Sequence, residues 1–362
     1  MSANRSLRSL RSLRTLRLLA ATDKFRGTAS AREASGAVVA AARDAGMDAQ
    51  GLPLSDGGEG FLEAMGGTVR RNVVTGPLGV PVEAEWRLLE TRPGETFVAV
   101  IEAAQAAGLL IAGGASRNDP DKATTAGVGE LLVAAWRAGA RDIIVGCGGS
   151  ASTDGGLGAV EAVLRAGGLP GARLRAAVDV QTLFLDAAAV FAPQKGADPA
   201  TVRRLAQRLE EIAARYARER GVDVRQVEGS GAAGGLGGGL VALGGTIESG
   251  FDIVARTLDL ATHLARADVV VTGEGRLDAT SLEGKVVGGI LRDVAPGTPL
   301  LVIAGDIAPG VERAARAATK ANLTLVSLVD RFGRDAAMGR TLELIRSVTT
   351  DYLESVAKDF LK

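Results

Sequence analysis

Three short segments combine acidic side chains with glycine, and each follows an apolar run that is typical of a buried strand. Asp56 lies in the first segment (residues 55–60), Asp154 in the second (148–156) and Glu274 in the third (272–278). Glycine lets backbone N–H groups approach an anion closely, and carboxylates among such amides can hold a metal ion or accept a proton. Because α/β proteins place their chemistry where parallel strands end, the three segments indicate a site for a phosphorylated ligand.

The chain holds few of the residues on which other chemistries depend. It has one histidine, His263, and one cysteine, Cys147, so a Cys/His metal site is excluded. A Ser-His-Asp triad would have to use His263, for which a surface or boundary position on a helix is favoured. The tripeptide at 284–286 lacks the spacing and the hydroxyl residue of a Walker A loop. Residues 229–239 match G-x-G-x-x-G, but the preceding run makes a poor buried strand, which disfavours NAD.

Length and charge limit the class of protein. A chain of 362 residues is long for one core, which favours two domains. Its 42 basic and 42 acidic residues balance, so nucleic acid is not an expected partner. A single cysteine fits a reducing compartment, and no apolar run reaches membrane-spanning length. We therefore expect a cytoplasmic protein that acts on a small molecule, with no membrane partner and with a homodimer as an open alternative.

The first 17 residues differ from the rest in composition. Arginine recurs at every third position from Arg5 to Arg17 among serine and leucine, and no acidic residue precedes Asp23. An organellar transit peptide has this composition, but we expect residues 1–17 to be a disordered N-terminal extension.

The apolar pattern predicts two α/β domains, one of them discontinuous. Two strands are expected before residue 75, at 16–21 and 51–54, with a helix between them that begins at the capping box of Ser30 and Glu33. Three more strands with their helices follow residue 266. We expect a flavodoxin-like domain with a parallel five-stranded sheet, formed by 18–75 and 266–362, and a second α/β domain, 76–265, inserted after its second strand.

This strand order predicts which turns lie together. The first and third strands of a flavodoxin-like sheet flank the point where the strand order reverses, and ligands bind there. The turn after the first strand carries Asp23, Lys24 and Arg26, and the turn after the third carries Glu274, Arg276 and Asp278. We expect the two turns to face each other although more than half of the chain separates them in sequence.

Seven motifs, in this order, resemble those of the type 1 glycerate kinases. They are TDKFRG (22–27), SDGGEG (55–60), TGPLG (75–79), GGSASTDGG (148–156), PQKGA (193–197), GAAGG (231–235) and TGEGRLD (272–278). The resemblance runs from about Leu18 to about Asp306. It implies ATP-dependent phosphorylation of D-glycerate with Mg²⁺, on two α/β domains of which one is inserted in the other.

Two stretches depart from the pattern of the family. The family's first turn usually reads Ala-Pro-Asp-Ser-Phe-Lys, whereas Thr22, Lys24 and Arg26 stand here in place of its proline, serine and lysine. The family's Cys-Asp-Val-x-Asn-Pro-Leu-x-Gly stretch corresponds to 178–186, where Asp179 is kept but the Asn-Pro pair and the glycine are not. A kinase for another small hydroxy acid or sugar acid therefore stays open, as does a non-catalytic nucleotide-binding relative.

Phosphoryl transfer to the hydroxyl of an acid needs a base, a cationic anchor and neutralisation of phosphate charge. Asp56 is the first choice for the base and Asp179 the second, Lys195 would neutralise charge on the transferred group, and Lys24 or Arg26 would clamp the substrate carboxylate. Further substrate contacts are expected from Asp23, Glu59, Glu274 and Arg276, phosphate contacts from Gly148, Gly149, Ser150, Ser152, Thr153, Gly231, Gly234 and Gly235, and Mg²⁺ ligands from Asp154 and Asp278. An aspartate before glycine is also commonly an Asx-turn residue, and this alternative stays open for Asp56 and Asp154.

Overall fold

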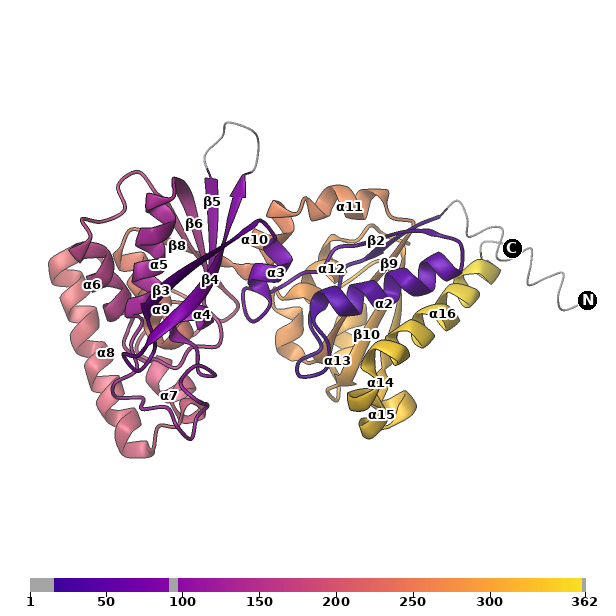
Figure 1. The fold of residues 1–362 in the computed structure, drawn as a ribbon. Coiled ribbons are helices and arrows are strands. Elements are labelled where there is room, and N and C mark those ends of the chain that lie inside the picture. Colours follow the sequence, from indigo (N-terminus) through magenta and orange to yellow (C-terminus); the bar gives the residue numbers. More distant parts are fainter. Residues whose placement is uncertain (1–15, 91–96, 360–362) are drawn as a thin grey trace, which may run out of the picture. The chain divides into compact units, whose positions relative to one another are not determined.

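A computed structural model of the chain describes residues 16–90 and 97–359 (Figure 1). These residues form two compact units, the first made of the described residues up to Asp56 together with those from Phe251 onward, and the second of Gly57–Gly250. Most of the expected N-terminal extension lies outside the described residues. Its last residue, Arg17, is the first residue of strand β1 (Arg17–Ala20) and therefore belongs to the sheet.

The first unit is built on a parallel sheet of five strands in the order β11-β10-β9-β1-β2. The other strands are β2 (Asp48–Gly51), β9 (Val269–Leu277), β10 (Pro299–Ile307) and β11 (Asn322–Ser327). All neighbouring strands pair in parallel, which confirms the predicted flavodoxin-like fold. β2 ends where the predicted strand 51–54 begins, although the N–H groups of Leu52 and Leu54 still donate to β1 and its turn. Pro53, between them, is tolerated because β2 is an edge strand.

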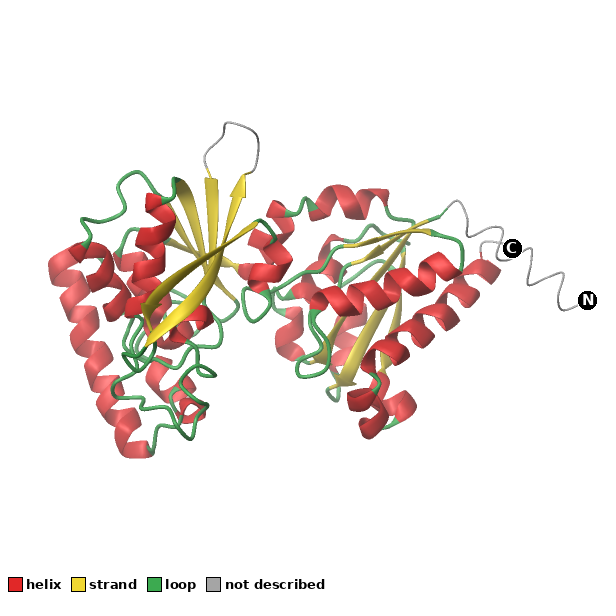
Figure 2. Ribbon diagram, in the orientation of Figure 1, coloured by secondary structure: helices red, strands yellow, loops and turns green. Residues whose placement is uncertain are grey.

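Helices cover both faces of this sheet (Figures 1 and 2). α2 (Ala31–Asp44) begins at the predicted capping box and packs on α16 (Thr341–Asp359) over strand residues such as Leu18 and Val271. Alternate strand residues such as Leu19 are equally buried and point to the opposite face, where α12 (Val286–Asp293) contacts β9. The other helical segments are α10 (Gly250–Thr257), α11 (Leu260–Arg266), η2 (Ala279–Leu282), α13 (Val311–Ala317), α14 (Leu328–Phe332) and α15 (Arg334–Gly339).

The second unit is built on a six-stranded mixed sheet in the order β3-β4-β5-β6-β7-β8. Its strands are β3 (Thr68–Thr75), β4 (Pro81–Glu90), β5 (Phe97–Glu102), β6 (Ala140–Gly146), β7 (Arg173–Val178) and β8 (Thr246–Ser249). β3, β4 and β5 pair with each other in antiparallel fashion, and β5 continues into a parallel set with β6, β7 and β8. Residues 68–75 pair with β4 in the second unit. The chain passes into this unit after Asp56 and returns to the first unit at Phe251, not at the breaks expected at 75 and 266. β3 has no apolar run that would mark it as a strand. Its residues are exposed up to Val73, and Val74 near its end is buried.

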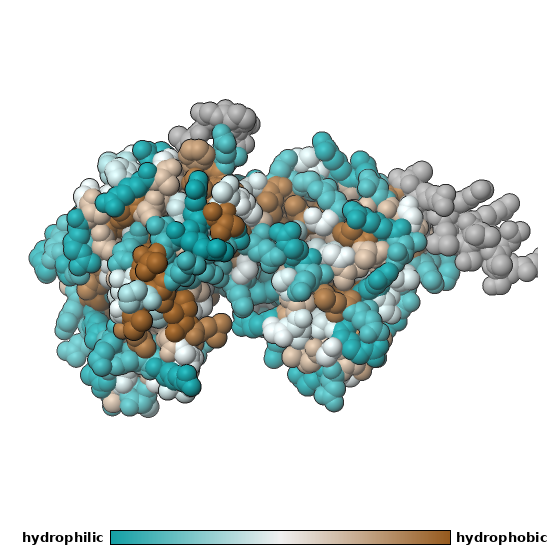
Figure 3. Space-filling view, in the orientation of Figure 1, coloured by the Kyte–Doolittle hydropathy of each residue, from teal (hydrophilic) through white to brown (hydrophobic). Residues whose placement is uncertain are grey.

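Helices of the second unit position its loops. They are α3 (Phe61–Met65), α4 (Ala104–Ala107), α5 (Ala126–Arg137), α6 (Leu157–Arg165), α7 (Ala187–Phe191), η1 (Pro193–Lys195), α8 (Pro199–Arg220) and α9 (Ala232–Ala242). α8 begins after its N-cap Asp198 and buries Leu205 and Leu209. The face shown in Figure 3 is largely hydrophilic and has scattered hydrophobic areas. Val73 on β3 is an exposed apolar side chain. In the part of the chain that the structure describes, none of the helices is both long and apolar enough to cross a membrane.

Candidate active site

The turns that follow β1 and β9 are hydrogen bonded to each other in the first unit. The N–H of Asp23 donates to the carbonyl of Gly273 over 2.9 Å, and the N–H of Gly275 donates to the carbonyl of Lys24 over 3.2 Å. A Cβ on Gly275 would lie 2.8 Å from the backbone nitrogen of Arg26, so a side chain there would separate the turns. The two turns therefore lie together at the reversal of strand order, as the sequence predicts.

Lys24 lies between two buried carboxylates. Its Nζ is 3.6 Å from Oδ1 of Asp23 and 3.6 Å from Oδ1 of Asp56, and the two aspartates are 6% and 8% exposed. Burial raises the pKa of Asp23 to about 6, with Asp56 adding to the rise and the charge of Lys24 opposing it. The arrangement places two carboxylates at the end of β1 beside the ammonium of Lys24.

Glu274 is a buried acid on β9. It is 9% exposed, and its Oε1 has no hydrogen-bond partner among the described residues. Burial raises the pKa of Glu274 to about 8; a hydrogen bond from Ser281 and the charge of Lys285 lower this pKa, and the charges of Asp23 and Asp278 raise it. Neither Ser281 nor Lys285 was expected at the site, because both lie beyond the motif at 272–278.

The remaining residues predicted on these turns differ in exposure. Arg26 and Arg276 are exposed. Asp278 begins η2 as its N-cap, and its Oδ1 accepts from the N–H of Thr280 over 3.0 Å and from the hydroxyl of Thr280 over 2.7 Å. These bonds lower the pKa of Asp278. The two arginines are therefore accessible to a ligand, whereas Asp278 supports the local fold.

In the second unit, Lys195 holds the loop that follows β6. Its side chain is buried, and its Nζ donates to Oγ of Ser150 over 2.8 Å and to the carbonyl of Ser152 over 2.6 Å. Burial lowers the pKa of Lys195 to about 7, and the charge of Asp154 opposes this shift. Asn118 reinforces the same contact, since its Nδ2 donates to the carbonyls of Ala151 and Lys195. No motif marks Asn118, which lies 77 positions from Lys195.

Asp154 links the starts of two helices. Its Oδ2 accepts from the N–H and the hydroxyl of Thr125, both over 2.8 Å, and from the N–H of Gly158 over 3.3 Å. Its Oδ1 accepts from the N–H of Gly156 over 3.1 Å. With four donors, the carboxylate is well satisfied without a ligand, which is the Asx-turn alternative that the sequence left open.

The glycine-rich segment at 231–235 packs on the same loop. Gly155 donates its N–H to the carbonyl of Gly234 over 3.0 Å, and a Cβ on Gly234 would overlap the carbonyl oxygen of Ser152. Ala233, at φ 52°, begins a run of three left-handed residues, a conformation that costs energy for a residue other than glycine. The hydroxyls of Ser152 and Thr153 are buried and lack a hydrogen-bond partner among the described residues. Backbone strain and unpaired buried hydroxyls commonly mark a ligand site.

Two further predicted residues are exposed on turns of the second unit. Asp179 follows β7, and its charge contributes to raising the pKa of the buried Cys147 to about 12, mainly an effect of burial. Glu59 lies on the turn at 57–60, where a Cβ on Gly148 would lie 2.8 Å from Cα of Gly58. The 57–60 turn, the start of the 148–156 loop and the end of β7 therefore lie close together.

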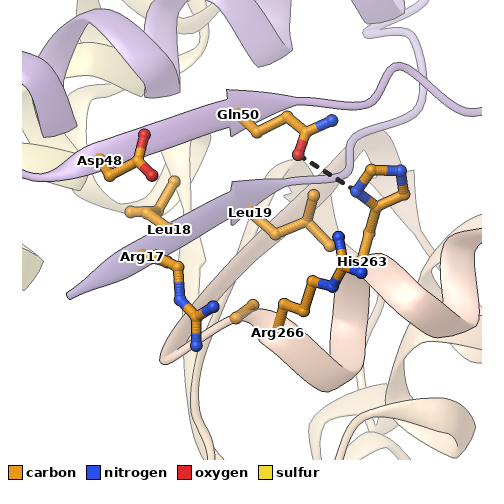
Figure 4. A pocket seen from close by; sticks show the side chains of 8 residues that line it. Arg17, Leu18, Leu19, Asp48, Gln50, His263 and Arg266 are labelled. Atoms are coloured by element: carbon orange, nitrogen blue, oxygen red, sulfur yellow. Dashed lines mark hydrogen bonds between the residues drawn. The ribbon is translucent and has the colours of Figure 1, made fainter.

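A cavity of the first unit lies away from these residues (Figure 4). It is at the amino ends of β1 and β2, where Arg17 and Asp48 line it together with residues of α11. Nδ1 of His263 is 3.1 Å from Oε1 of Gln50 there. His263 thus occupies the boundary position on a helix that the sequence predicts, and none of the predicted site residues lines this cavity.

Comparisons with known proteins agree with the order of the motifs. The family model described as the glycerate kinase family matches residues 18–166 and 165–357. Glycerate 2-kinase of Escherichia coli K12 is 36% identical over 334 residues, 81% of this chain and 86% of that protein. Glycerate kinase of Bacillus subtilis 168 is 36% identical over 329 residues, 80% of this chain and 85% of that protein.

A relative and a solved structure extend the comparison. An uncharacterized protein of Mycobacterium tuberculosis is 46% identical over 272 residues, 70% of this chain and 69% of that protein. The crystal structure of a "putative glycerate kinase 2" from Salmonella typhimurium LT2 is similar with a TM-score of 0.79 and 31% identity, over 96% of this chain and 100% of that chain. On the match of the family model and these identities, the chain belongs to the glycerate kinase family.

Proposed function

We propose that this chain transfers the γ-phosphoryl group of ATP to a hydroxyl of D-glycerate, with Asp56 as the base. The observation that carries the assignment is the pair of buried carboxylates, Asp23 and Asp56, held on either side of Lys24. In the reaction, the hydroxyl oxygen bonds to the γ-phosphorus, the bond from this phosphorus to the bridging oxygen of ADP breaks, and the hydroxyl proton passes to Asp56. Membership of the family supports ATP as the phosphoryl donor.

Arg26 is the better anchor for the carboxylate of glycerate. The ammonium of Lys24 already lies 3.6 Å from each of two carboxylates, whereas the guanidinium of Arg26 is exposed. A guanidinium can bind a carboxylate through two parallel hydrogen bonds, which fixes its orientation as well as its position. Arg276, on the neighbouring turn, is a second exposed cation for the same anion.

The second unit supplies the phosphate-binding groups in this proposal. Gly148, Gly149, Gly234 and Gly235 carry no side chain over the backbone, and the left-handed residues 233–235 form a turn of the kind whose amides can face an anion. The N–H groups of Gly231 and Gly235 already donate to the carbonyls of Thr182 and Gly231, so these two amides are not among the proposed phosphate donors. Lys195 keeps the 148–156 loop in shape through Ser150 and Ser152, and in its protonated form its charge favours a phosphate nearby. The buried hydroxyls of Ser152 and Thr153 are further donors for phosphate oxygens.

The two aspartates expected to bind Mg²⁺ do not fit that role. Asp154 already accepts four hydrogen bonds and Asp278 caps η2. The described residues also contain no group of three or more His, Cys, Asp or Glu side chains that could hold a metal ion. Mg²⁺ often binds through phosphates and water with few protein ligands, so we propose it as the counter-ion that accompanies ATP and derive no step through it.

The type 1 subgroup is also a proposal, supported by the seven ordered motifs. A different small hydroxy acid is the second candidate substrate, and Lys24 favours it. This lysine replaces the serine of the family's first turn and lies between Asp23 and Asp56, so it changes the charge of the acid-binding turn.

Release of ADP over a panel of acids tests the proposal. Purified protein with ATP and Mg²⁺ is given D-glycerate, L-glycerate, glycolate, lactate and a sugar acid in turn, and kcat/KM is measured for each. We expect D-glycerate to give the highest value. A higher value for another acid would support the second candidate, and retained ATP binding without turnover of any acid would reject both in favour of a non-catalytic relative.

A further inference from the structure

We propose that Glu274 is protonated in the resting enzyme and donates a hydrogen bond from its carboxyl group to the carboxylate of the acid substrate. The inference rests on the proposed function, because it assigns a role in binding the same acid. It deepens that function, since it predicts a neutral donor where an anionic ligand must be held and therefore a preference for substrates that carry a carboxylate.

The geometry around Glu274 leaves part of its hydrogen-bonding capacity unused. The residue is only 9% exposed, and its Oε1 is buried without a hydrogen-bond partner among the described residues. A buried polar atom without a partner costs free energy, and such atoms in native structures commonly have a ligand or a catalytic role. The unpaired atom belongs to β9, next to Gly273, whose carbonyl accepts from the N–H of Asp23. It therefore lies at the carboxyl end of the sheet, where α/β proteins bind ligands.

The charges that face Glu274 disfavour its ionised form. Asp23 faces it from the turn after β1, Asp278 from the end of β9 and Lys285 from the segment before α12. Burial is the main reason that the pKa of Glu274 rises to about 8, and the two acidic groups, Asp23 and Asp278, add to the rise. Ser281 and the charge of Lys285 oppose this rise only in part. At neutral pH most molecules then carry a carboxylic acid at this position, which can donate one hydrogen bond.

The substrate carboxylate is the acceptor that best suits this donor. A hydrogen bond from a neutral O–H to an anionic oxygen is short and about twice as strong as a bond between neutral groups. If Glu274 ionises, the same position loses its donor and repels the substrate. The affinity for the acid should therefore fall as pH rises through the pKa of Glu274, while the affinity for ATP should not.

Steady-state kinetics of the wild type, Glu274→Gln and Glu283→Gln test the inference. Glutamine keeps a donor at every pH and matches the shape of the protonated acid, and Glu283 is an exposed acid nearby whose change serves as the control. For the wild type we expect the KM for D-glycerate to rise about tenfold between about pH 7 and pH 9, because about a tenth of the molecules keep the proton at the higher pH. Glu274→Gln should stay within about threefold of the wild type at about pH 7 and lose this rise, and Glu283→Gln should keep it.

Infrared spectroscopy provides a readout that does not depend on turnover. The wild type at about pH 7 should show the C=O band of a protonated carboxylic acid that is absent from Glu274→Gln and that shifts when D-glycerate is added. Absence of this band, or a rise in KM with pH that Glu274→Gln retains in an active enzyme, would overturn the inference while the proposed function stands. A protein that turns over no acid refutes the proposed function instead. In that protein, the band and its shift with D-glycerate still decide for or against Glu274 as the donor.

Discussion

Nζ of Lys24 lies 3.6 Å from Oδ1 of Asp56, at the end of the chain segment that follows β2. Both side chains are largely buried, so a favourable charge interaction here is screened less by solvent than one at the surface. The pairing holds Asp56 in place and leaves the exposed Arg26, rather than Lys24, to bind a negatively charged substrate.

Replacing Asp56 by asparagine should abolish most of the turnover without unfolding the protein. An amide cannot accept the proton of the substrate hydroxyl, and a catalytic base typically contributes about 10²–10⁴-fold in rate. We expect kcat to fall by that factor while the circular dichroism spectrum is unchanged. Asp335→Asn, an exposed aspartate of α15, should leave kcat unchanged. If Asp56→Asn keeps more than about a tenth of the wild-type kcat, the base is another residue, and Asp179 is the next to change.

Replacing Arg26 by leucine should weaken binding of the acid and spare that of ATP. The change removes a cation able to form two hydrogen bonds to a carboxylate, so the KM for glycerate should rise about tenfold or more. Arg26→Lys should recover part of the loss because charge returns without the two-pronged geometry. Arg137→Leu, at an exposed end of α5, is the control and should change neither KM. An equal rise of both KM values in Arg26→Leu would assign Arg26 to the nucleotide.

Replacing Gly234 by alanine should destabilise the packing of 231–235 on the 148–156 loop, which we propose to bind phosphate. Gly234 has φ 70°, and the added Cβ would overlap the carbonyl oxygen of Ser152. We expect the free energy of unfolding to fall by about 2–4 kcal/mol and the Kd for ATP to rise. Gly36→Ala, on helix α2, is the matched control, because a Cβ added at Gly36 would have no neighbouring atom within 4 Å outside the backbone of its own helix. That change should raise the free energy of unfolding by about 0.5–1 kcal/mol. Chemical denaturation that shows equal effects would contradict the close packing of 231–235 on the loop.

Replacing Lys195 by methionine should reduce the affinity for ATP. Methionine is apolar and can fill the buried space, but the carbonyl of Ser152 and the hydroxyl of Ser150 lose a charged donor. The loop is then held less firmly and the site loses a cation, so calorimetry should show a Kd for ATP about tenfold higher, which corresponds to about 1.4 kcal/mol. Ser150→Ala removes one of the two bonds and should have a smaller effect. Lys122→Met, at a side chain that is 80% exposed, should have none. Unchanged ATP binding in Lys195→Met would remove Lys195 from the nucleotide site.

The stability of the protein should depend on pH through Glu274. Its pKa is raised from 4.5 to about 8 on folding, so the folded state binds more protons than the unfolded state between these values. The contribution of Glu274 to the free energy of unfolding is therefore fully present below its unfolded pKa and is lost as pH rises toward about 8, with a slope of at most about 1.4 kcal/mol per pH unit.

Urea denaturation of the wild type and Glu274→Gln across this pH range measures the effect. The free energy of the wild type relative to the variant should fall with rising pH and become constant above about pH 8. A difference that does not vary with pH would mean that Glu274 has an ordinary pKa in the folded protein.

The sequence predicts the fold of the first unit better than the detailed contacts of the site residues in either unit. Apolar runs such as 269–271 and 300–303 lie in central parallel strands, which are buried on both faces and therefore easy to recognise. β3 was missed because it is an edge strand, exposed along most of its length. The strand predicted at 51–54 falls just after β2. The residues of β2 itself are mostly exposed at the other edge of the sheet, so they lack the apolar run that marks a buried strand.

The roles of single acidic residues depend on contacts that no local pattern contains. Asp154 and Asp56 both precede glycine, yet Asp154 accepts hydrogen bonds from Thr125, 29 positions earlier, and Asp56 lies beside Lys24. The burial of Glu274 likewise results from the packing of a distant turn on β9. Composition and spacing therefore identify the segments that carry the chemistry, and tertiary contacts decide what each carboxylate does.

Phosphorus NMR of the reaction products tests the central claim most directly. The purified protein is incubated with ATP, Mg²⁺ and D-glycerate, and the spectrum is followed over time. The proposed function predicts that the γ-phosphate signal of ATP declines while ADP and a phosphomonoester with the shift of a phosphoglycerate appear in equal amounts, and that Asp56→Asn suppresses both. ATP that stays intact, or that yields only inorganic phosphate with D-glycerate present, would contradict the assignment of this chain as a kinase that phosphorylates glycerate.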